Sequence, residues 1–214
     1  MKYRKIMFVV LISTLAITVK QSFLWSGEPS VLVEEVVLNE SSFDEIEDIR
    51  ERKIKQWELI SPSLNFEVIS ERVMGEYWAE CLHDEKREFV ELFTDHLKHA
   101  YVNKVNPLLG KKIISLKEKQ INNFAKVQTI LLVQSGKEIS TDFYLLRKNG
   151  EWKICDMVVE GVSMVNNYRS QIINTMVNAS YDELLRKIKN KQDRKFYSNE
   201  RGLLVSEQST EYVE

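Results

Sequence analysis

The sequence is poor in the residues and motifs that mark most enzymes and covalent anchors. It has two cysteines, Cys81 and Cys155, which are too few for a disulfide framework; they either pair or remain buried free thiols. No cysteine lies directly after the N-terminal apolar run, so we expect no lipoprotein anchor. The chain also lacks a G-x-S-x-G, a phosphate-binding glycine loop, an H-E-x-x-H and a C-x-x-C. We therefore expect neither an enzyme nor a metal site of these common kinds.

Basic charge is also scarce outside the N-terminus. The formal net charge is -2, and the first 26 residues carry four basic side chains and no acid. The rest of the chain then has 26 basic residues against 32 acidic ones. A mildly acidic body offers no basic surface for phosphates, so we expect no nucleic-acid binding.

The N-terminus has the pattern of an export signal. "MKYRK" is a basic n-region, and "IMFVVLISTLAITV" is an apolar run of about 14 residues, which is short for a membrane span. No clean A-x-A site follows, so residues 1–26 are expected to be a signal peptide or an uncleaved anchor. We expect an ordered domain over residues 28–190. Residues 191–214 are polar and aperiodic, which predicts a disordered tail.

The first half of the ordered region favours helices. "EPSVLVEEVVL" predicts one, and "SSFDEIEDIRERKIKQWELI" a second, with Ser41 or Ser42 as its N-cap and Glu45 near N3. "NFEVISERVMGEYWAECL" predicts a third, in which Gly75 indicates a close approach to the backbone. "HDEKREFVELFTDHLKHAYVNKV" is the clearest amphipathic helix, with Asp84 as its cap.

The middle of the chain changes to a period of two. "KKIISLKEKQI", "NFAKVQTILLVQ", "EISTDFYLLRK" and "EWKICDMVVE" predict four strands, and the short turns "SGK" and "NG" predict an antiparallel meander. The helical period returns after Gly161, and "ASYDELLRKIKN" predicts a last helix with Ser180 as cap and Glu183 at N3. This order predicts an α+β fold: a curved four-stranded antiparallel sheet, NTF2-like, with helices on one face enclosing an apolar cavity.

Two pairs of polar residues are candidates for chemistry. His96 and His99 lie at i and i+3 on one helix, a spacing that can hold a metal. The apolar stripe of that helix runs elsewhere, so we expect both on its solvent side. Asp142 and Asp156 interrupt strands and are candidates for acid–base work. No histidine or nucleophile accompanies them, so a catalytic role is the weaker interpretation.

Residues 150–172 carry the most specific pattern in the chain. "GEWKICDMVVEGVSMVNNYRSQI" closely resembles the signature of the MlaC-type toluene-tolerance family, the periplasmic phospholipid shuttles of the lipid-asymmetry system. The family's Asp-x-x-x-Glu-Gly-Val-Ser motif falls on residues 156–163, and its Tyr-Arg-Ser-Gln on residues 168–171. "NFEVISERVMGEYW" and "DEKREFVELFTDHLKHAY" are similar to two of its helices, in the same order. The resemblance covers about residues 30–190.

The resemblance implies a monomeric periplasmic carrier that holds one phospholipid, with acyl tails inside and the headgroup at the mouth. Its partners would be an outer-membrane lipoprotein–porin complex and an inner-membrane ABC transporter with an MCE-domain subunit. No cofactor, metal or catalysis is implied, because the lipid is cargo. A lipid-free envelope scaffold, or an enzyme that uses one of the two aspartates, are the competing hypotheses.

The resemblance also implies roles for particular residues. Trp152, Asp156, Gly161, Ser163 and Arg169 would be structural: the glycine permits a sharp exit from strand to helix, the serine caps the helix, and the arginine braces the turn through Asp156 or Glu160. Large apolar side chains either pack solidly or line a slot, which composition does not decide. The residues expected to line it are Phe66, Val73, Met74, Tyr77, Phe89, Phe93, Leu97, Tyr101, Leu131, Phe143, Leu145, Val158, Val162, Met164 and Tyr168.

Overall fold

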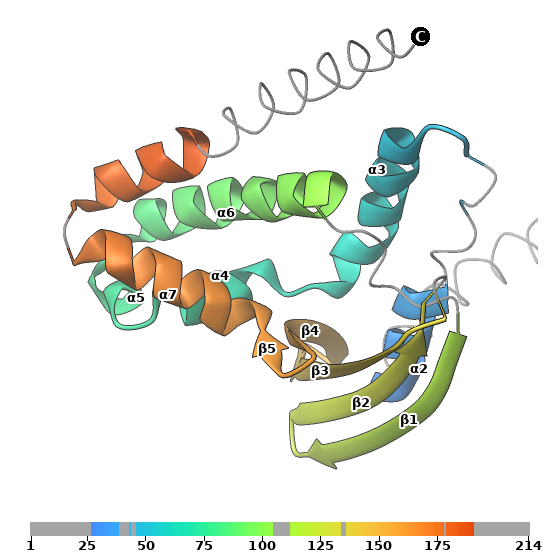
Figure 1. Ribbon diagram of the computed structural model, residues 1–214. Helices are drawn as coiled ribbons and strands as arrows, with labels where there is room; N and C mark the ends of the chain where they lie inside the picture. Colours follow the sequence, from blue (N-terminus) through green and yellow to red (C-terminus); the bar gives the residue numbers. More distant parts are fainter. Residues whose placement is uncertain are drawn as a thin grey trace, which may run out of the picture. The chain divides into compact units, whose positions relative to one another are not determined.

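The chain folds into two compact units, each built from two separated stretches (Figure 1). The computed structural model describes residues 27–38, 43, 46–104, 112–133, 136–177 and 179–190. The predicted signal segment and tail lie outside the described residues. The first unit takes its described residues from the chain up to Asn65 and from Lys112 to Met164, and the second from the remainder.

The first unit contains a curved antiparallel sheet whose strands follow one another in chain order (Figure 1). The four predicted strands are confirmed almost residue for residue, but the sheet has five strands. The fifth forms because Glu160 and Gly161, with φ of 50° and 82°, turn the chain back. Val158 and Val159 then pair with Ser163 and Val162. The strands are β1 (Lys112–Ile121), β2 (Phe124–Leu132), β3 (Glu138–Lys148), β4 (Glu151–Val159) and β5 (Val162–Ser163).

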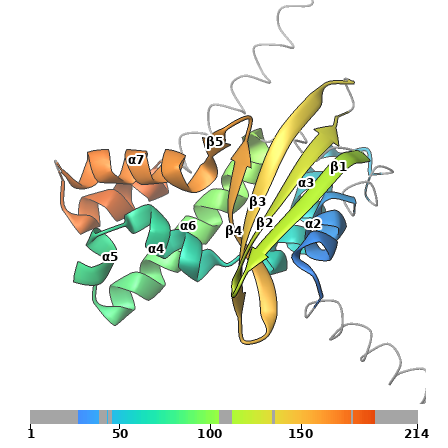
Figure 2. The same cartoon turned by 90° about the horizontal axis from the view of Figure 1, so that it is seen from below.

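Helix α2 (Pro29–Leu38) covers one face of this sheet, beside β1 and β2 (Figure 2). The face is identified by Glu118, which accepts a hydrogen bond from the Ser30 N–H at 2.8 Å and pairs in register with Val127. Directly paired residues point to the same side of a sheet, so Val127 and its β3 partner Phe143 lie beneath α2. The buried apolar positions of β2 and β3 therefore form the core of this unit.

A β-bulge at Cys155 changes which side chains of β4 face this core. Tyr144 pairs with Asp156 and Leu145 with Ile154, which leaves Cys155 as the extra residue. Beyond the bulge Val158 pairs with Asp142, on the face opposite Phe143. Val158 therefore does not share a face with Phe143, although the sequence predicts both in one slot.

Helix α3 (Ile49–Ile60) begins later than the sequence predicts and is followed by the short helix η2 (Ser61–Ser63). Its N-cap is Asp48, whose carboxylate accepts hydrogen bonds from the N–H groups of Arg50 at 2.7 Å and Glu51 at 3.1 Å. The predicted helix start is therefore wrong. The proposed capping residues, 41, 42 and 45, lie outside the described residues.

The second unit is helical, and its first segment breaks where the sequence predicts one continuous helix. The helices are α4 (Phe66–Met74), α5 (Tyr77–Glu80), α6 (His83–Lys104), α7 (from Met164 of the first unit to Met176) and residues 181–190. The break lies at Gly75, whose φ is +60°. A Cβ there would lie 2.9 Å from the Arg169 guanidinium. The predicted close approach to this glycine is thus confirmed.

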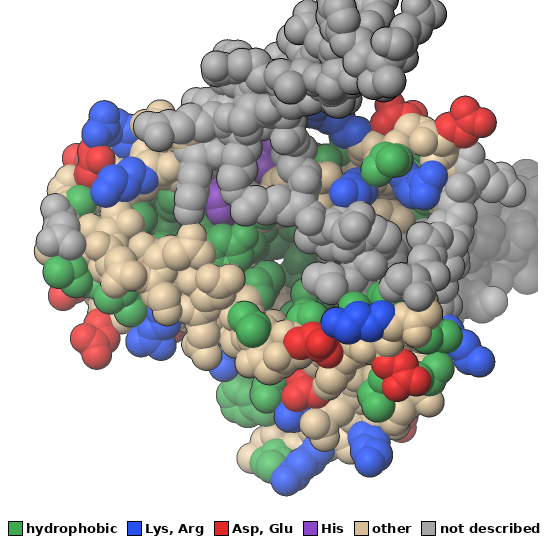
Figure 3. All heavy atoms as spheres, in the orientation of Figure 1, with side chains coloured by type: hydrophobic (Ala, Val, Ile, Leu, Met, Phe, Trp, Pro, Cys, Tyr) green, Lys and Arg blue, Asp and Glu red, His purple; other side chains and the backbone are tan. Residues whose placement is uncertain are grey.

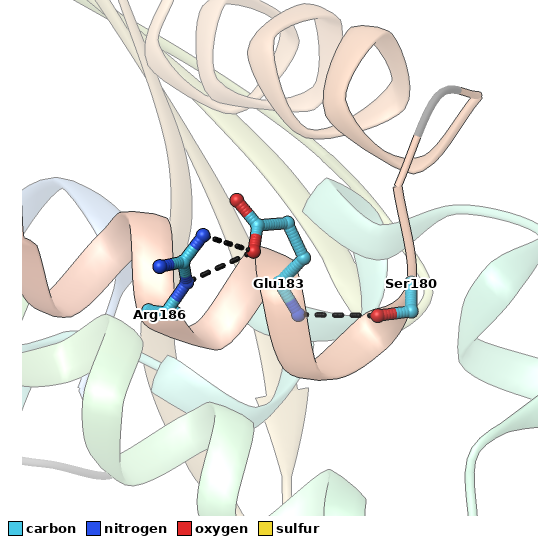
Figure 4. A network of polar contacts seen from close by, with 3 residues as sticks. All are labelled: Ser180, Glu183 and Arg186. Atoms are coloured by element: carbon cyan, nitrogen blue, oxygen red, sulfur yellow. Dashed lines mark hydrogen bonds and ion pairs between the residues drawn. The ribbon is translucent and has the colours of Figure 1, made fainter.

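Two helices of this unit begin with side-chain caps. At the start of α6 the Glu85 carboxylate accepts a hydrogen bond from the Leu82 N–H at 2.6 Å, whereas Asp84, the predicted cap, lies within the first turn. The helix over residues 181–190 begins as predicted, because Ser180 Oγ accepts a hydrogen bond from the Glu183 N–H at 3.3 Å (Figure 4). Within the described residues, no helix combines the length and the apolar character that a membrane crossing requires.

Candidate functional site

Three helices of the second unit line a half-open cavity of about 410 Å³. This volume falls within the range of about 300–1,000 Å³ that is typical of small-molecule sites. In the view of Figure 3, histidine side chains lie beside hydrophobic ones in a recessed part of the surface. From α6, α7 and the last helix, the lining residues are Phe93, His96, Tyr168, Gln171, Ile172, Thr175, Glu183, Leu184, Arg186, Lys187, Ile188 and Asn190.

Aromatic rings form one wall of the cavity. Phe93 is 1% exposed, and its ring stacks on Phe89 with a centroid distance of 5.4 Å. Tyr168 from α7 meets the Phe93 ring edge-on at 5.2 Å and the His96 ring at 5.6 Å. Burial raises the pKa of the Tyr168 phenol, so this group stays neutral well above neutral pH. Together with buried Ile172, the Phe93 and Tyr168 rings give the cavity an apolar wall.

The last helix gives the cavity a polar rim. Glu183 accepts hydrogen bonds from Arg186 Nε at 2.9 Å and Nη2 at 2.5 Å (Figure 4). Because the Glu183 N–H is also held by Ser180, this ion pair is anchored to the first turn of the helix. Lys187 adds a second exposed cation. The cavity is therefore amphipathic, with an apolar wall and charged groups at its edge.

The two histidines that the sequence places on one side of the helix differ in exposure in the structure. His99 is exposed as predicted, but His96 is half-buried and lines the cavity, so the prediction for it is wrong. The reason is helical geometry, since His96 is three residues from Phe93 and its ring lies 6.1 Å from the phenylalanine ring. In the part of the chain that the structure describes, His, Cys, Asp and Glu form no group that could hold a metal ion.

The residues of the 156–163 motif build the hairpin between β4 and β5. The Asp156 carboxylate accepts hydrogen bonds from Ser163 Oγ at 2.6 Å and from the Met157 N–H at 2.8 Å. The expected direct exit from strand to helix at Gly161 is thus a hairpin with a fifth strand, and Ser163 bonds back across it. The motif acts here as a structural clasp on the last turn of the sheet.

The turn residue Glu160 is fastened to the neighbouring strand. Its carboxylate accepts hydrogen bonds from the Ser140 N–H at 3.2 Å and from Lys137 Nζ at 3.3 Å. Both contacts lower the pKa of Glu160, and the hydrogen bond from the Ser140 backbone has the larger effect. The Arg169 guanidinium, a predicted brace for this turn, lies against Gly75 of the helical unit.

The second candidate acid, Asp142, is engaged in an ion pair. Its carboxylate lies 2.8 Å from Lys126 Nζ on the neighbouring strand. This hydrogen bond raises the pKa of Lys126, so the lysine is charged at neutral pH. Asp142 and Asp156 thus both have structural partners. The two cysteines are free, Cys155 buried and Cys81 half-buried, so the disulfide alternative is not realised.

Comparison with known proteins identifies the family. A sequence profile for the family described as MlaC protein matches residues 35–190. The chain belongs to the MlaC family. The match spans both units and every residue that lines the cavity.

Two individual proteins extend this comparison. The "Intermembrane phospholipid transport system binding protein MlaC" of Haemophilus influenzae is 25% identical over 132 residues, which is 59% of this chain and 62% of that protein's length. A solved phospholipid-binding protein from Ralstonia solanacearum, described as in complex with a phospholipid, superposes with a TM-score of 0.62 at 14% identity. That match covers 78% of this chain and 95% of the other. At this identity the likeness establishes the fold.

Against this family background, the residues expected to line a slot fall into distinct groups. Phe93 and Tyr168 line the cavity. In the helical unit Val73, Met74, Phe89 and Leu97 are buried core residues, and Phe66, Tyr77 and Tyr101 are half-buried. In the sheet unit Leu131, Phe143 and Leu145 are 1% exposed, Val158 and Met164 are half-buried, and Val162 is 60% exposed.

Sequence reasoning missed the contribution of the last helix to the cavity. Leu184 and Ile188 are both buried and line it, and they are four residues apart on one helix face. That spacing is readable in "ASYDELLRKIKN", but a short helix next to a polar tail gives no sign of what its apolar stripe covers. Gln171 and Thr175 likewise lie one turn apart on α7, beside the predicted Tyr168.

Proposed function

We propose that this protein is a periplasmic phospholipid carrier that shuttles lipid between outer- and inner-membrane complexes and thereby maintains outer-membrane lipid asymmetry. The observation that carries the proposal is the family match over residues 35–190. It is supported by the name of the Haemophilus relative and by the phospholipid held by the Ralstonia protein. The amphipathic cavity gives the proposal a site in this chain.

In this proposal an acyl tail lies in the cavity against Phe93, Tyr168 and Ile172, and the headgroup lies near the polar rim. The other predicted apolar residues of the helical unit complete the surroundings of the tail. Transfer of each CH₂ from water gains about 0.8 kcal/mol, so a bound tail is held strongly. Release must then be coupled to a partner that opens the site or competes for the lipid.

The same proposal assigns the regions of the chain and its partners. Residues 1–26 are a signal peptide or an uncleaved anchor, residues 28–190 an NTF2-like lipid-binding domain, and residues 191–214 a polar tail. The protein works in the periplasm as a monomer. It receives and delivers lipid at an outer-membrane lipoprotein–porin complex and at an inner-membrane ABC transporter with an MCE-domain subunit.

No chemical change of the lipid is part of the proposal. The two candidate acids hold a hairpin and a cross-strand ion pair, which are sufficient reasons for their presence. A lipid-free scaffold remains the second candidate, and one observation favours it. Val73, Met74, Phe89, Leu131, Phe143 and Leu145 are at most 1% exposed, as in a filled core.

A transfer assay separates a carrier from a scaffold. Donor vesicles hold a self-quenched fluorescent phospholipid, acceptor vesicles hold none, and the protein is added in catalytic amount. A carrier raises the rate of dequenching in proportion to protein concentration, whereas a scaffold leaves it at the spontaneous rate. Asp142→Asn and Asp156→Asn serve as controls for the enzyme hypothesis: lipid products that disappear in a folded variant would indicate catalysis instead.

A further inference from the structure

The turn between β1 and β2 presents two apolar side chains to solvent. Ile121 is 59% exposed and Phe124 is 62% exposed, and the two residues pair with each other across the turn. The turn is held in place by the Arg147 N–H of β3, which donates a hydrogen bond to the Asn123 carbonyl at 2.8 Å. We call these two residues the β1–β2 tip. It is a fixed apolar projection at one end of the sheet.

Lysines follow the tip along the same face. Paired residues share a face, and so do residues two apart on a strand, so Lys119 and its partner Lys126 form the row behind the tip. Lys117 lies one further step back, and both Lys117 and Lys119 are exposed. The acid between them, Glu118, points to the opposite face towards Ser30. The alternation thus places Lys117 and Lys119 on the tip face as exposed cations, whereas Lys126 on that face is paired with Asp142.

The apolar tip and the lysines behind it match the order of layers at the surface of a bilayer. Successive rows on a strand face are about 7 Å apart, and side chains that anchor at a membrane interface reach about 5–10 Å into the headgroup and acyl boundary. A tip at that depth brings the lysines level with the phosphates, where their long stems let the ammonium groups reach anionic oxygens. Hydrophobic and basic side chains stand side by side at the lower end of the sheet in Figure 3.

We propose that the β1–β2 tip docks on bilayers that contain anionic phospholipid, with Ile121 and Phe124 at the acyl boundary and Lys117 and Lys119 against the phosphates. The tip belongs to the sheet unit, whereas the cavity lies in the helical unit. Docking therefore needs no lipid in the cavity and does not rest on the proposed carrier function. Its role would be to hold the protein at a membrane surface.

Flotation with vesicles tests this proposal on the whole purified protein. Vesicles of phosphatidylcholine with phosphatidylglycerol should carry the protein upward, and phosphatidylcholine alone should carry much less. Phe124→Ser should weaken binding about tenfold, because the ring no longer leaves water. Lys119→Glu should weaken vesicle binding to a similar degree by reversing a charge at the headgroups. Added salt should abolish the difference in binding between this variant and the wild type.

The matched control is Ile130→Ser compared with Ile121→Ser. Ile130 lies on β2 on the same face, six residues and therefore about 20 Å from Phe124. Its variant should float like the wild type. Equal flotation of the tip and control variants would overturn the proposal. So would a wild-type protein that stays unbound at every phosphatidylglycerol content, which would leave a protein partner as the occupant of the tip. Bound lipid, measured separately by native mass spectrometry, reports on the carrier function independently.

Discussion

Replacing Phe93 by alanine, compared with the same change at Phe89, distinguishes a lipid-lining residue from a core residue. The two rings stack on each other on α6, and both are fully buried. Phe93 lines the cavity, whereas Phe89 does not belong to its lining. The pair is thus matched in residue type, helix and burial, and differs in contact with the proposed cargo.

The expected losses of stability are similar. A buried Phe→Ala change costs about 3–5 kcal/mol. Phe93 borders a cavity, so part of its ring already lacks packed neighbours, and we expect a value near 3 kcal/mol. The Phe89→Ala change should lower the free energy of unfolding by about 4 kcal/mol. Urea unfolding of the delipidated variants, followed by tryptophan fluorescence, measures both values.

The expected effects on lipid differ. Loss of the Phe93 ring removes part of the apolar wall, worth about 1.4 kcal/mol, so lipid should be retained about tenfold less well. Phe89→Ala should retain lipid at the wild-type level in conditions where it is folded. The assay is the ratio of bound phospholipid to protein after repeated washing with empty vesicles. Equal retention in the two variants would refute the placement of the tails beside Phe93.

Three further predictions concern the structural residues. Gly75→Ala should cost about 1–2 kcal/mol in urea unfolding, because the site has a left-handed backbone and a guanidinium lies against it; an unchanged midpoint would contradict this. Ser163→Ala should cost about 1.5–3 kcal/mol through its lost bond to the Asp156 carboxylate, and a neutral result would mean that the clasp is unimportant. Glu160 has a lowered pKa in the folded protein, so its contribution to stability is complete above the unfolded pKa and is lost as pH falls through the folded value. Carbon-13 NMR titration should show that Lys137→Met moves this pKa upward, and an unmoved pKa would exclude the lysine as a cause.

The strands of this fold are readable from the sequence because their signals are local. Alternation of apolar and polar residues sets each strand, and Asn149 and Gly150, with φ of 55° and 86°, take the left-handed conformations that a two-residue hairpin requires. The long helix α6 is equally clear from Phe89, Phe93 and Leu97 at four-residue steps. These features depend on neighbours within a few residues.

The features that escape prediction depend on tertiary contacts. The bulge at Cys155 has no sequence signature, yet it reverses the face of Val158. The fifth strand needs the hydrogen-bond partner β4 as well as the turn residues that start it. Cap assignments at Asp84 and at the start of α3 failed because several acids and serines nearby offer the same chemistry. Only the fold selects Asp48 and Glu85.

The candidate site was partly predictable for the same reason. Phe93 and Tyr168 stand on apolar stripes and were expected at the site, and both line the cavity. Leu131, Phe143 and Leu145 of the sheet unit have the same apolar periodicity in sequence, but they are packed on the face beneath α2. Periodicity shows which side chains leave water, and it does not show whether a partner helix or a ligand covers them.

Native mass spectrometry of the purified protein, followed by organic extraction, tests the central claim most directly. The account predicts a mass shift equal to one phospholipid, which disappears after extraction and reappears as lipid in the extract. A protein that shows only its own mass under the gentlest conditions, with no phospholipid in the extract, would contradict it.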